Sequence, residues 1–208
     1  MSGTLYIISA PSGAGKTSLV HQLIERDNKI TVSVSSTTRP MREGEKDGVN
    51  YFFLSVDAFE ERIAQNDFLE HANVFGNYYG TSKSIVEELL AKDKDVILEI
   101  DWQGAEQVRK IMPNTQSIFI LPPSPEELER RLRSRATDSD EVIAKRLAES
   151  VNEMSHYPEF DYIVINNHFQ TALEELHSIF LAGRLKQEKQ FEKHQSMFEH
   201  LLELSSQD

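Results

Sequence analysis

The stretch that decides the fold is Ser9-Ala10-Pro11-Ser12-Gly13-Ala14-Gly15-Lys16-Thr17. It matches the phosphate-binding pattern G-x-x-x-x-G-K-[ST], with alanine in the first glycine position. In this pattern, backbone N–H groups and a helix N-terminus surround the phosphates. The lysine neutralises the β and γ oxygens, and the hydroxyl of the last residue binds Mg²⁺. An apolar run precedes the stretch and a segment of helical spacing follows it, which favours a nucleotide site over an ordinary glycine-rich turn.

Working outward, short apolar runs alternate with longer segments of helical periodicity, as is typical of a parallel α/β sheet. We expect strands at Leu5–Ser9, Thr31–Ser35, Val96–Ile100, Ser117–Leu121 and Tyr162–Ile165. We expect helices at Thr17–Arg26, Asp57–Asn66, Ser84–Lys92, Gly104–Met112, Pro125–Ser134, Asp140–Ser155 and, as one long helix, about Thr171–Leu204. The strands lack in-and-out alternation, so helices should cover both faces of the sheet.

Two segments interrupt this alternation. Residues 36–80 are rich in Tyr, Phe, Asn and Gly and hold strand-like pieces at Tyr51–Leu54 and Asn73–Phe75, which indicates a small mixed β insertion. Residues 121–155 are almost entirely of helical pattern and rich in arginine. Both read as subdomains attached to one α/β core.

Composition excludes several classes of protein. The chain has 208 residues, a formal net charge of −12 and no cysteine, which excludes disulfide scaffolds, thiol nucleophiles and cysteine-ligated metals and fits a reducing, cytoplasmic location. Its apolar runs are far shorter than the ~20 residues that span a bilayer. The net charge argues against nucleic acid and anionic membranes as partners.

Arginines gather locally in this acidic chain. Arg131 and Arg135 are four residues apart, hence on one helix face, and Arg146 lies in the next predicted helix. Arg39 and Arg42 follow the second predicted strand, with Tyr51 nearby. Because guanidinium groups bind phosphate oxygens bidentately, the first cluster suits a transferring phosphoryl group and the second a phosphorylated acceptor. Solvated basic helix faces are the alternative.

Longer motifs accompany the phosphate-binding stretch in a fixed order. They are Val34–Arg42, Gly44-Glu45, Tyr51-Phe52, Phe68-Leu69-Glu70, Gly76–Thr81 (GNYYGT), Glu99–Gly104 (EIDWQG), Pro122-Pro123-Ser124, Arg131–Arg135, Lys145-Arg146-Leu147 and Val164–Asn167. With these motifs the chain resembles the guanylate kinase family, closely its bacterial members, from Leu5 to about Leu181. The GNYYGT and IDWQG strings are much more specific than the phosphate-binding stretch.

The resemblance implies a single domain of residues 1–208 built in three parts. The core would comprise about residues 1–35, 93–121 and 157–208. A GMP-binding insertion would occupy about residues 36–92, and a mobile lid over ATP about residues 122–156.

It also implies roles for individual residues. ATP would be bound by residues 10–17 (Ala10, Pro11, Ser12, Gly13, Ala14, Gly15, Lys16 and Thr17) and by Asn166. GMP would be bound by Ser35, Arg39, Arg42, Tyr51, Glu70, Tyr79, Gly80, Thr81 and Asp101. Mg²⁺ would arrive with ATP and meet Thr17 and Asp101. Lys16, Arg42, Arg131, Arg135 and Arg146 would act in catalysis.

The physics of base recognition agrees with this assignment. Guanine presents two adjacent donors that one carboxylate can accept together, whereas adenine presents an acceptor that would leave Glu70 unpaired. We therefore expect transfer of the ATP γ-phosphoryl to GMP, giving GDP and ADP in purine nucleotide metabolism. Two alternatives stay open: a kinase of the same fold with another phosphorylated acceptor, and a catalytically inactive interaction module. Glu70 could instead be a solvated charge at a strand end.

The segment after Gly183 mixes lysines and glutamates with Phe191, Phe198 and Leu201-Leu202. A solvated or core-packing helix is one interpretation, and a homo-oligomer contact is the other.

Overall fold

The computed structural model describes residues 3–135 and 140–203. Its centre is a five-stranded sheet in the order β2 (Ile30–Val32), β7 (Asp95–Leu98), β1 (Leu5–Ser9), β8 (Gln116–Leu121) and β9 (Tyr162–Ile165). Every neighbouring pair in it is parallel. The predicted α/β parallel core is confirmed, although the second strand ends at Val32 and not at Ser35.

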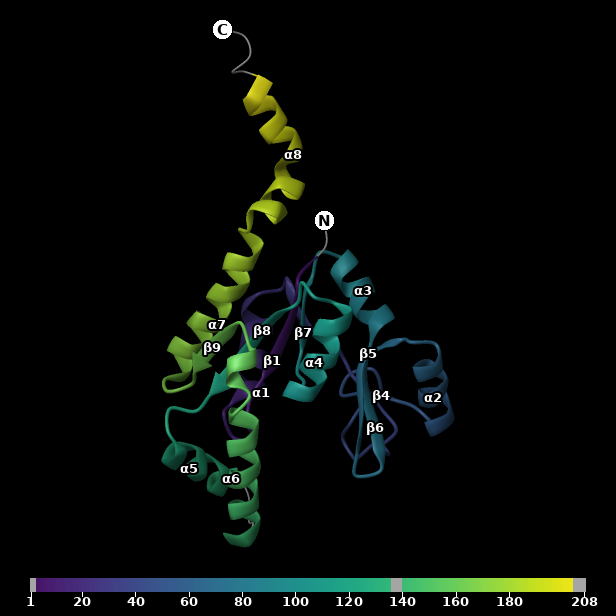
Figure 1. The fold of residues 1–208 in the computed structure, drawn as a ribbon, viewed down its shortest axis with the longest axis vertical. Helices are drawn as coiled ribbons and strands as arrows, with labels where there is room; N and C mark the ends of the chain where they lie inside the picture. Colours follow the sequence, from purple (N-terminus) through teal and green to yellow (C-terminus); the bar gives the residue numbers. More distant parts are fainter. Residues whose placement is uncertain (1–2, 136–139, 204–208) are drawn as a thin grey trace.

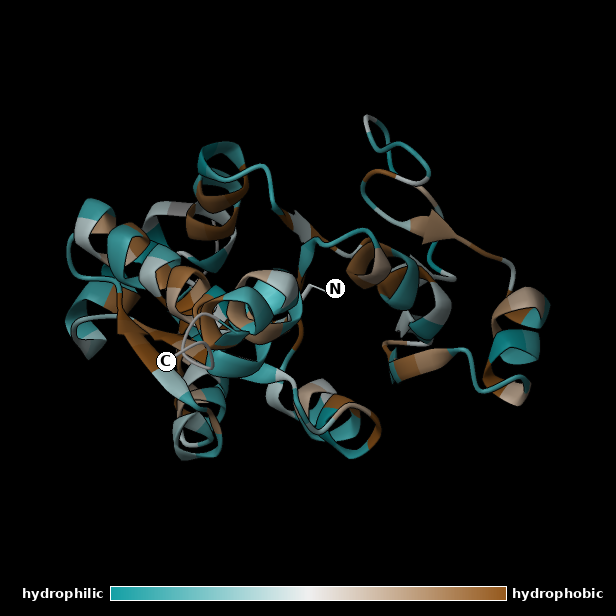
Figure 2. Ribbon diagram, turned by 90° about the horizontal axis from the view of Figure 1, so that it is seen from above, coloured by the Kyte–Doolittle hydropathy of each residue, from teal (hydrophilic) through white to brown (hydrophobic). Residues whose placement is uncertain are grey.

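Helices cover both faces of this sheet (Figure 2). Successive strand residues point to opposite faces, and residues on each face are apolar and buried against the helices there. Tyr6 and Ile8 of β1 pack with α1 (Lys16–Arg26) and α7 (Phe169–Arg184). Leu5 and Ile7 pack with α3 (Lys83–Ala91) and α4 (Trp102–Ile111). The sheet is thereby the middle layer of three.

The insertion forms a second, mixed sheet beside the core (Figure 1). Its order is β4 (Phe52–Phe53), β3 (Ser36–Thr37), β6 (Asn77–Ser82) and β5 (Phe68–Val74), with β3 and β4 parallel and the other pairs antiparallel. Helix α2 (Val56–Ala64) connects β4 to β5. The carboxamide of Gln107 in α4 bonds both the N–H and the C=O of His71 in β5, which fixes this sheet to the core.

The arginine-rich segment folds into helices α5 (Pro125–Arg135) and α6 (Asp140–Met154), followed by the 3₁₀ turn Tyr157–Glu159. Helix α5 starts where the sequence predicts, because the Ser124 hydroxyl accepts a hydrogen bond from the N–H of Glu127 at 3.2 Å. Both helices lie on the opposite side of the core from the insertion (Figure 1).

The prediction of one long C-terminal helix was wrong. The segment forms two helices, α7 and α8 (Gln187–Glu203), separated at Leu185 and Lys186. Helix α7 is held by its apolar face on the sheet, whereas α8 has no buried residue and extends away from the body (Figure 1). The last turn before the break also contains Gly183, a weak helix former. No helix in the described ranges is long and apolar enough to cross a membrane.

Candidate active site

The phosphate loop, residues 10–17, links the carboxyl end of β1 to the start of α1. Gly13 and Gly15 have φ of +90° and +93°, a region that side chains rarely adopt. A Cβ on Gly15 would also lie 2.4 Å from Nδ2 of Asn166. Glycine is thus required at both positions for the backbone to turn its N–H groups around an anion.

Two side chains brought from distant segments hold this loop. Asn166, which is buried after β9, donates from Nδ2 to the Ala14 carbonyl at 2.8 Å. Arg131 of α5 donates to the Asn166 carbonyl at 2.9 Å and to the Ala14 carbonyl at 3.4 Å. Glu127 fixes Arg131 by accepting from its Nε at 2.7 Å. The structure therefore brings both predicted residues to the phosphate loop.

Lys16 lies in an acidic, half-buried environment. Its Nζ is 3.9 Å from Oε2 of Glu99, at the end of β7. Burial lowers the pKa of Lys16, and the charges of Glu99, Glu153 and Asp101 partly oppose this shift. Glu153 of α6 also accepts a hydrogen bond from the Ser12 N–H at 3.3 Å. A carboxylate of α6 therefore lies at a backbone N–H group that the motif assigns to phosphate.

Oxygen donors suited to Mg²⁺ flank the loop. Thr17 is exposed in the first turn of α1. Asp101 is also exposed and caps α4 by accepting from the Gly104 N–H at 2.8 Å, while Glu99 lies two residues before it. Within the described ranges no three acidic, histidine or cysteine side chains gather as a metal cage. Hydroxyl and carboxylate oxygens in small number suit a hard cation that keeps phosphate and water ligands.

Glu70 of β5 is a buried carboxylate of the insertion, next to Gly104 of α4. Its side chain is 8% exposed and accepts a hydrogen bond from the Thr81 hydroxyl at 2.6 Å. Burial, together with the charge of nearby Asp101, raises the pKa of Glu70 to about 7 against the opposing hydrogen bonds from Thr81. The solvated alternative for Glu70 is thereby excluded: it is a buried carboxylate with capacity to accept further donors.

A close backbone approach supports this carboxylate. Gly80 of β6 lies so near β5 that a Cβ there would be 2.9 Å from the Glu70 carbonyl oxygen. Gly80 pairs in turn with Ser36 across the sheet. Ser35 precedes that pair, half-buried, with its carbonyl accepting from the Phe52 N–H at 2.9 Å. Gly80, Thr81 and Ser35 thus converge where the sequence predicts a base site.

Arg39, Tyr51 and Tyr79 form a second group of side chains in the insertion. The Arg39 guanidinium lies 5.5 Å from the ring centre of Tyr51, and the rings of Tyr51 and Tyr79 are 6.0 Å apart. Glu45 binds Arg39 with two hydrogen bonds of 2.8 and 3.0 Å and accepts from the Arg42 N–H at 2.7 Å. The Arg42 side chain is exposed. Glu45 is a residue to which the sequence reasoning gave no role, although Gly44-Glu45 was among the matching motifs.

The structure defines fewer side-chain contacts for the other two arginines that the sequence assigns to a lid, Arg135 and Arg146. Arg135 ends α5, and its side chain lies outside the described residues. Arg146 is partly buried on α6 and has an interacting partner.

A ring stack joins the segment after α6 to the start of α4. The ring centres of Trp102, next to Asp101, and His156, just after α6, are 3.6 Å apart with planes inclined by 8°. No function had been assigned to either residue from the sequence.

Similarity to known proteins establishes the family of the chain. The family model described as guanylate kinase matches residues 2–182. The chain belongs to the guanylate kinase family. It is 69% identical over 201 residues to the guanylate kinase of Hydrogenovibrio crunogenus, covering 97% of this chain and 98% of that one. It is 55% identical over 202 residues to the guanylate kinase of Escherichia coli K12, covering 96% and 98%.

A solved guanylate kinase shares the fold. The crystal structure from Anaplasma phagocytophilum superposes with a TM-score of 0.70 at 34% identity, covering 89% of this chain and 88% of that one. Membership of the guanylate kinase family therefore rests on both sequence and three-dimensional structure.

Proposed function

We propose that this protein transfers the γ-phosphoryl group of ATP to GMP and releases ADP and GDP. The observation that carries the proposal is the buried Glu70 carboxylate, held by Thr81, in a chain that also has a phosphate loop. One carboxylate can accept both N1–H and N2–H₂ of guanine, and Glu70 has capacity left for these bonds. Membership of the guanylate kinase family supports the same substrate pair.

On the donor side, the backbone of residues 10–15 and the N-terminus of α1 would bind the ATP phosphates, and Lys16 would neutralise their oxygens. Asn166 keeps the loop in shape through Ala14, next to the position expected for adenine. Thr17 and Asp101 would hold the Mg²⁺ that accompanies ATP, which supplies charge neutralisation between the β- and γ-phosphates.

On the acceptor side, Arg39, Arg42, Tyr51 and Tyr79 would hold the GMP phosphate. Ser35, Gly80, Thr81 and Asp101 would surround the base together with Glu70. The acceptor is already an anion, so the reaction requires alignment and charge neutralisation more than a general base.

The lid would complete the site by supplying Arg131, Arg135 and Arg146 to the transferring group. Because Glu153 accepts from the Ser12 N–H, a phosphate that binds this group must displace the carboxylate. Burial raises the pKa of Glu153, so its charge is held at some cost in this position. We expect ATP binding to exchange this contact for arginine contacts and to exclude water from the site.

The test is a coupled assay of ADP release with GMP, AMP and UMP as acceptors. We expect GMP to be preferred by at least about 100-fold in kcat/KM. The Arg135→Ala variant should lose kcat while the KM for GMP changes little, and Lys145→Ala, on the exposed part of α6, is the matched control. A preference for AMP, or unchanged turnover of Arg135→Ala, contradicts the proposal.

We also propose a cytoplasmic location and a contact between two copies of the chain through α8. Helix α8 has no buried residue, and Phe191, Leu201 and Leu202 on it are exposed. Light scattering on the purified chain and on a Leu201→Glu/Leu202→Glu variant tests the contact. An equal mass for both proteins contradicts it.

A further inference from the structure

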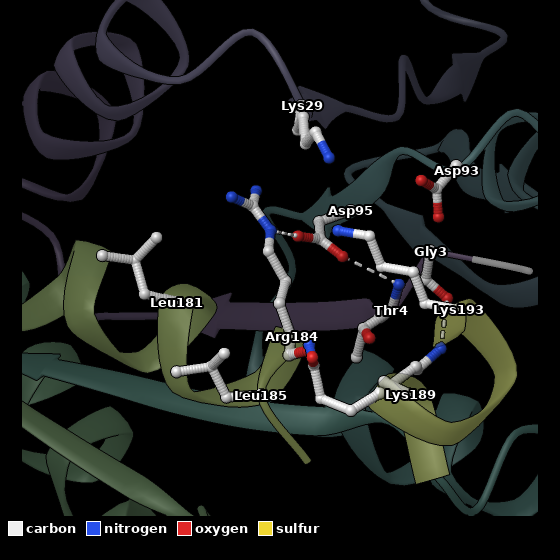
Figure 3. A pocket seen from close by; sticks show the side chains of 11 residues that line it. Gly3, Thr4, Lys29, Asp93, Asp95, Leu181, Arg184, Leu185, Lys189 and Lys193 are labelled. Atoms are coloured by element: carbon white, nitrogen blue, oxygen red, sulfur yellow. Dashed lines mark hydrogen bonds and ion pairs between the residues drawn. The ribbon is translucent and has the colours of Figure 1, made fainter. Parts of the chain in front are cut away.

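A cavity of about 360 Å³ lies at the opposite end of the sheet from the phosphate loop. Its walls are the amino ends of β1 and β7, the turn before β2, the end of α7 and the first turns of α8 (Figure 3). None of its lining residues belongs to the candidate active site. Its size falls within the range of small-molecule sites.

Basic side chains from separate segments meet in this cavity. Lys29 precedes β2, Arg184 ends α7, and Lys189 and Lys193 lie four residues apart on one face of α8. Figure 3 shows the ends of Lys29, Lys193 and Arg184 around Asp95. The acidic side chains that line the cavity are Asp93 and Asp95. In a protein of net charge −12, such a gathering of cations is a distinct local feature.

The floor of the cavity is fixed by hydrogen bonds and ion pairs that engage both oxygens of its buried carboxylate, Asp95. Asp95 is 4% exposed, and its two oxygens accept from the Thr4 N–H at 2.9 Å and from Arg184 Nε at 2.7 Å. Arg184 also donates from Nη1 to Asp27 at 2.7 Å. Burial alone would raise the pKa of Asp27, but hydrogen bonds from Arg184, the Lys29 N–H and His177 hold it at about 2. Asp27 therefore remains charged, and both carboxylates are bound to Arg184.

Donors are left over after these pairs are formed. Nη2 of Arg184 is buried and has no hydrogen-bond partner. Within residues 3–135 and 140–203, the ammonium groups of Lys29 and Lys193 make no hydrogen bond or ion pair. Lys189 donates to the Gly3 carbonyl at 3.3 Å, which brings α8 against the edge of the sheet. The cavity thus combines a rigid floor with unused cationic donors on two walls.

We propose that this cavity is a second binding site, separate from the kinase site, for a small phosphorylated molecule. Lys29 and Lys193 would bind the phosphate oxygens from opposite walls, and Arg184 would supply its remaining donor. Leu181 and Leu185 line the cavity beside these groups and offer an apolar surface for the rest of the ligand. A bound anion would bridge the sheet to α8, which has no buried residue of its own.

The probe is inorganic pyrophosphate, titrated calorimetrically at constant ionic strength without Mg²⁺. We expect two classes of sites on the full-length protein, one at the phosphate loop and one in the cavity. Lys16→Ala should remove the first class and leave the second. Lys29→Ala/Lys193→Ala should remove or weaken the second class at least tenfold and leave GMP kinase turnover unchanged.

The matched control is Lys145→Ala/Lys186→Ala, which removes the same charge from two exposed lysines outside the cavity. Circular dichroism of each variant without pyrophosphate verifies folding. A single class of sites on the wild-type protein, lost in Lys16→Ala, would overturn the proposal. Equal weakening of the second class in the control variant would also overturn it, because that result indicates only general charge attraction.

Discussion

Glu45 accepts hydrogen bonds from Arg39 with both carboxylate oxygens, at 2.8 and 3.0 Å, and its Oε2 also accepts a hydrogen bond from the N–H of Arg42. The side chains are only 12% and 19% exposed for Arg39 and Glu45, respectively. Hydrogen bonds from Arg39 and from the Arg42 N–H lower the pKa of Glu45, so the pair is charged throughout the neutral range. Because Arg39 Nη1 also donates to the Pro40 carbonyl at 2.7 Å, the guanidinium is fixed in orientation.

Glu45→Gln should therefore raise the KM for GMP about tenfold, because a neutral amide holds the guanidinium less firmly. The value of kcat at saturating GMP should change much less, and guanosine, which lacks the phosphate, should bind as it does to the wild type. Steady-state kinetics and calorimetry measure the two effects. Glu43→Gln, a neighbouring exposed carboxylate, is the control, and an equal KM for both variants contradicts the positioning role of Glu45.

Glu70→Gln should change the preferred base. An amide offers one acceptor and one donor, which matches the edge of adenine and clashes with one of the two guanine donors. We expect kcat/KM for GMP to fall by about 10- to 100-fold and the ratio of GMP to AMP turnover to fall with it. The coupled assay with both acceptors provides the ratio. If that ratio is unchanged, Glu70 does not read the base.

The raised pKa of Glu70 also makes stability depend on pH. Its folded-state pKa is about 7 and its ordinary value is 4.5, so the folded protein binds this proton more tightly than the unfolded chain. The free energy of unfolding should therefore fall as the pH rises from about 4.5 to 7, by up to about 3 kcal/mol, and this cost persists above pH 7. Urea unfolding at pH 5 and pH 8 measures it. Glu70→Gln should lack this component, and the same pH slope in both proteins would refute the assignment.

Gly183 allows α7 to approach β1 more closely than any other residue could. A Cβ at this position would lie 2.2 Å from the Tyr6 hydroxyl oxygen, and Tyr6 is fully buried. Although alanine usually favours a helix, Gly183→Ala should lower the free energy of unfolding by about 1–3 kcal/mol through overpacking. Adding Tyr6→Phe removes the clashing atom and should restore most of this loss. Thermal denaturation of the single and double variants measures the loss of stability. If the effects of Gly183→Ala and Tyr6→Phe simply add, the predicted clash with the Tyr6 hydroxyl is contradicted.

The sequence predicted the parallel core well because its strands are continuous apolar runs and its phosphate loop has a strict pattern. Strand β6 was missed, since Gly76–Thr81 has the composition of a turn and becomes extended only by pairing with β5. The break between α7 and α8 was missed for a similar reason, because helical periodicity continues through it and only packing distinguishes the two parts.

The site could be predicted in its residues more than in its contacts. Motifs predicted Lys16, Glu70, Thr81 and Arg39 as site residues; in the structure Lys16 lies in the phosphate loop at the start of α1, Glu70 contacts Thr81, and Arg39 lies elsewhere in the insertion. The Glu153 contact with Ser12 joins residues 141 positions apart, so no local pattern indicates it. Arg131 likewise bonds to backbone carbonyl groups at the phosphate loop, and because every residue has such a group, no residue type indicates the contact.

Trp102 is the only tryptophan of the chain, and its ring stacks on that of His156, just after α6. An imidazole in contact with an indole alters the indole's emission, so the protein carries an intrinsic fluorescent reporter between α4 and the segment after α6. Any motion of α6 that separates the two rings would change the fluorescence without a label. Such a motion could therefore be timed in the unmodified protein, with His156→Ala as the reference for an indole without the imidazole contact.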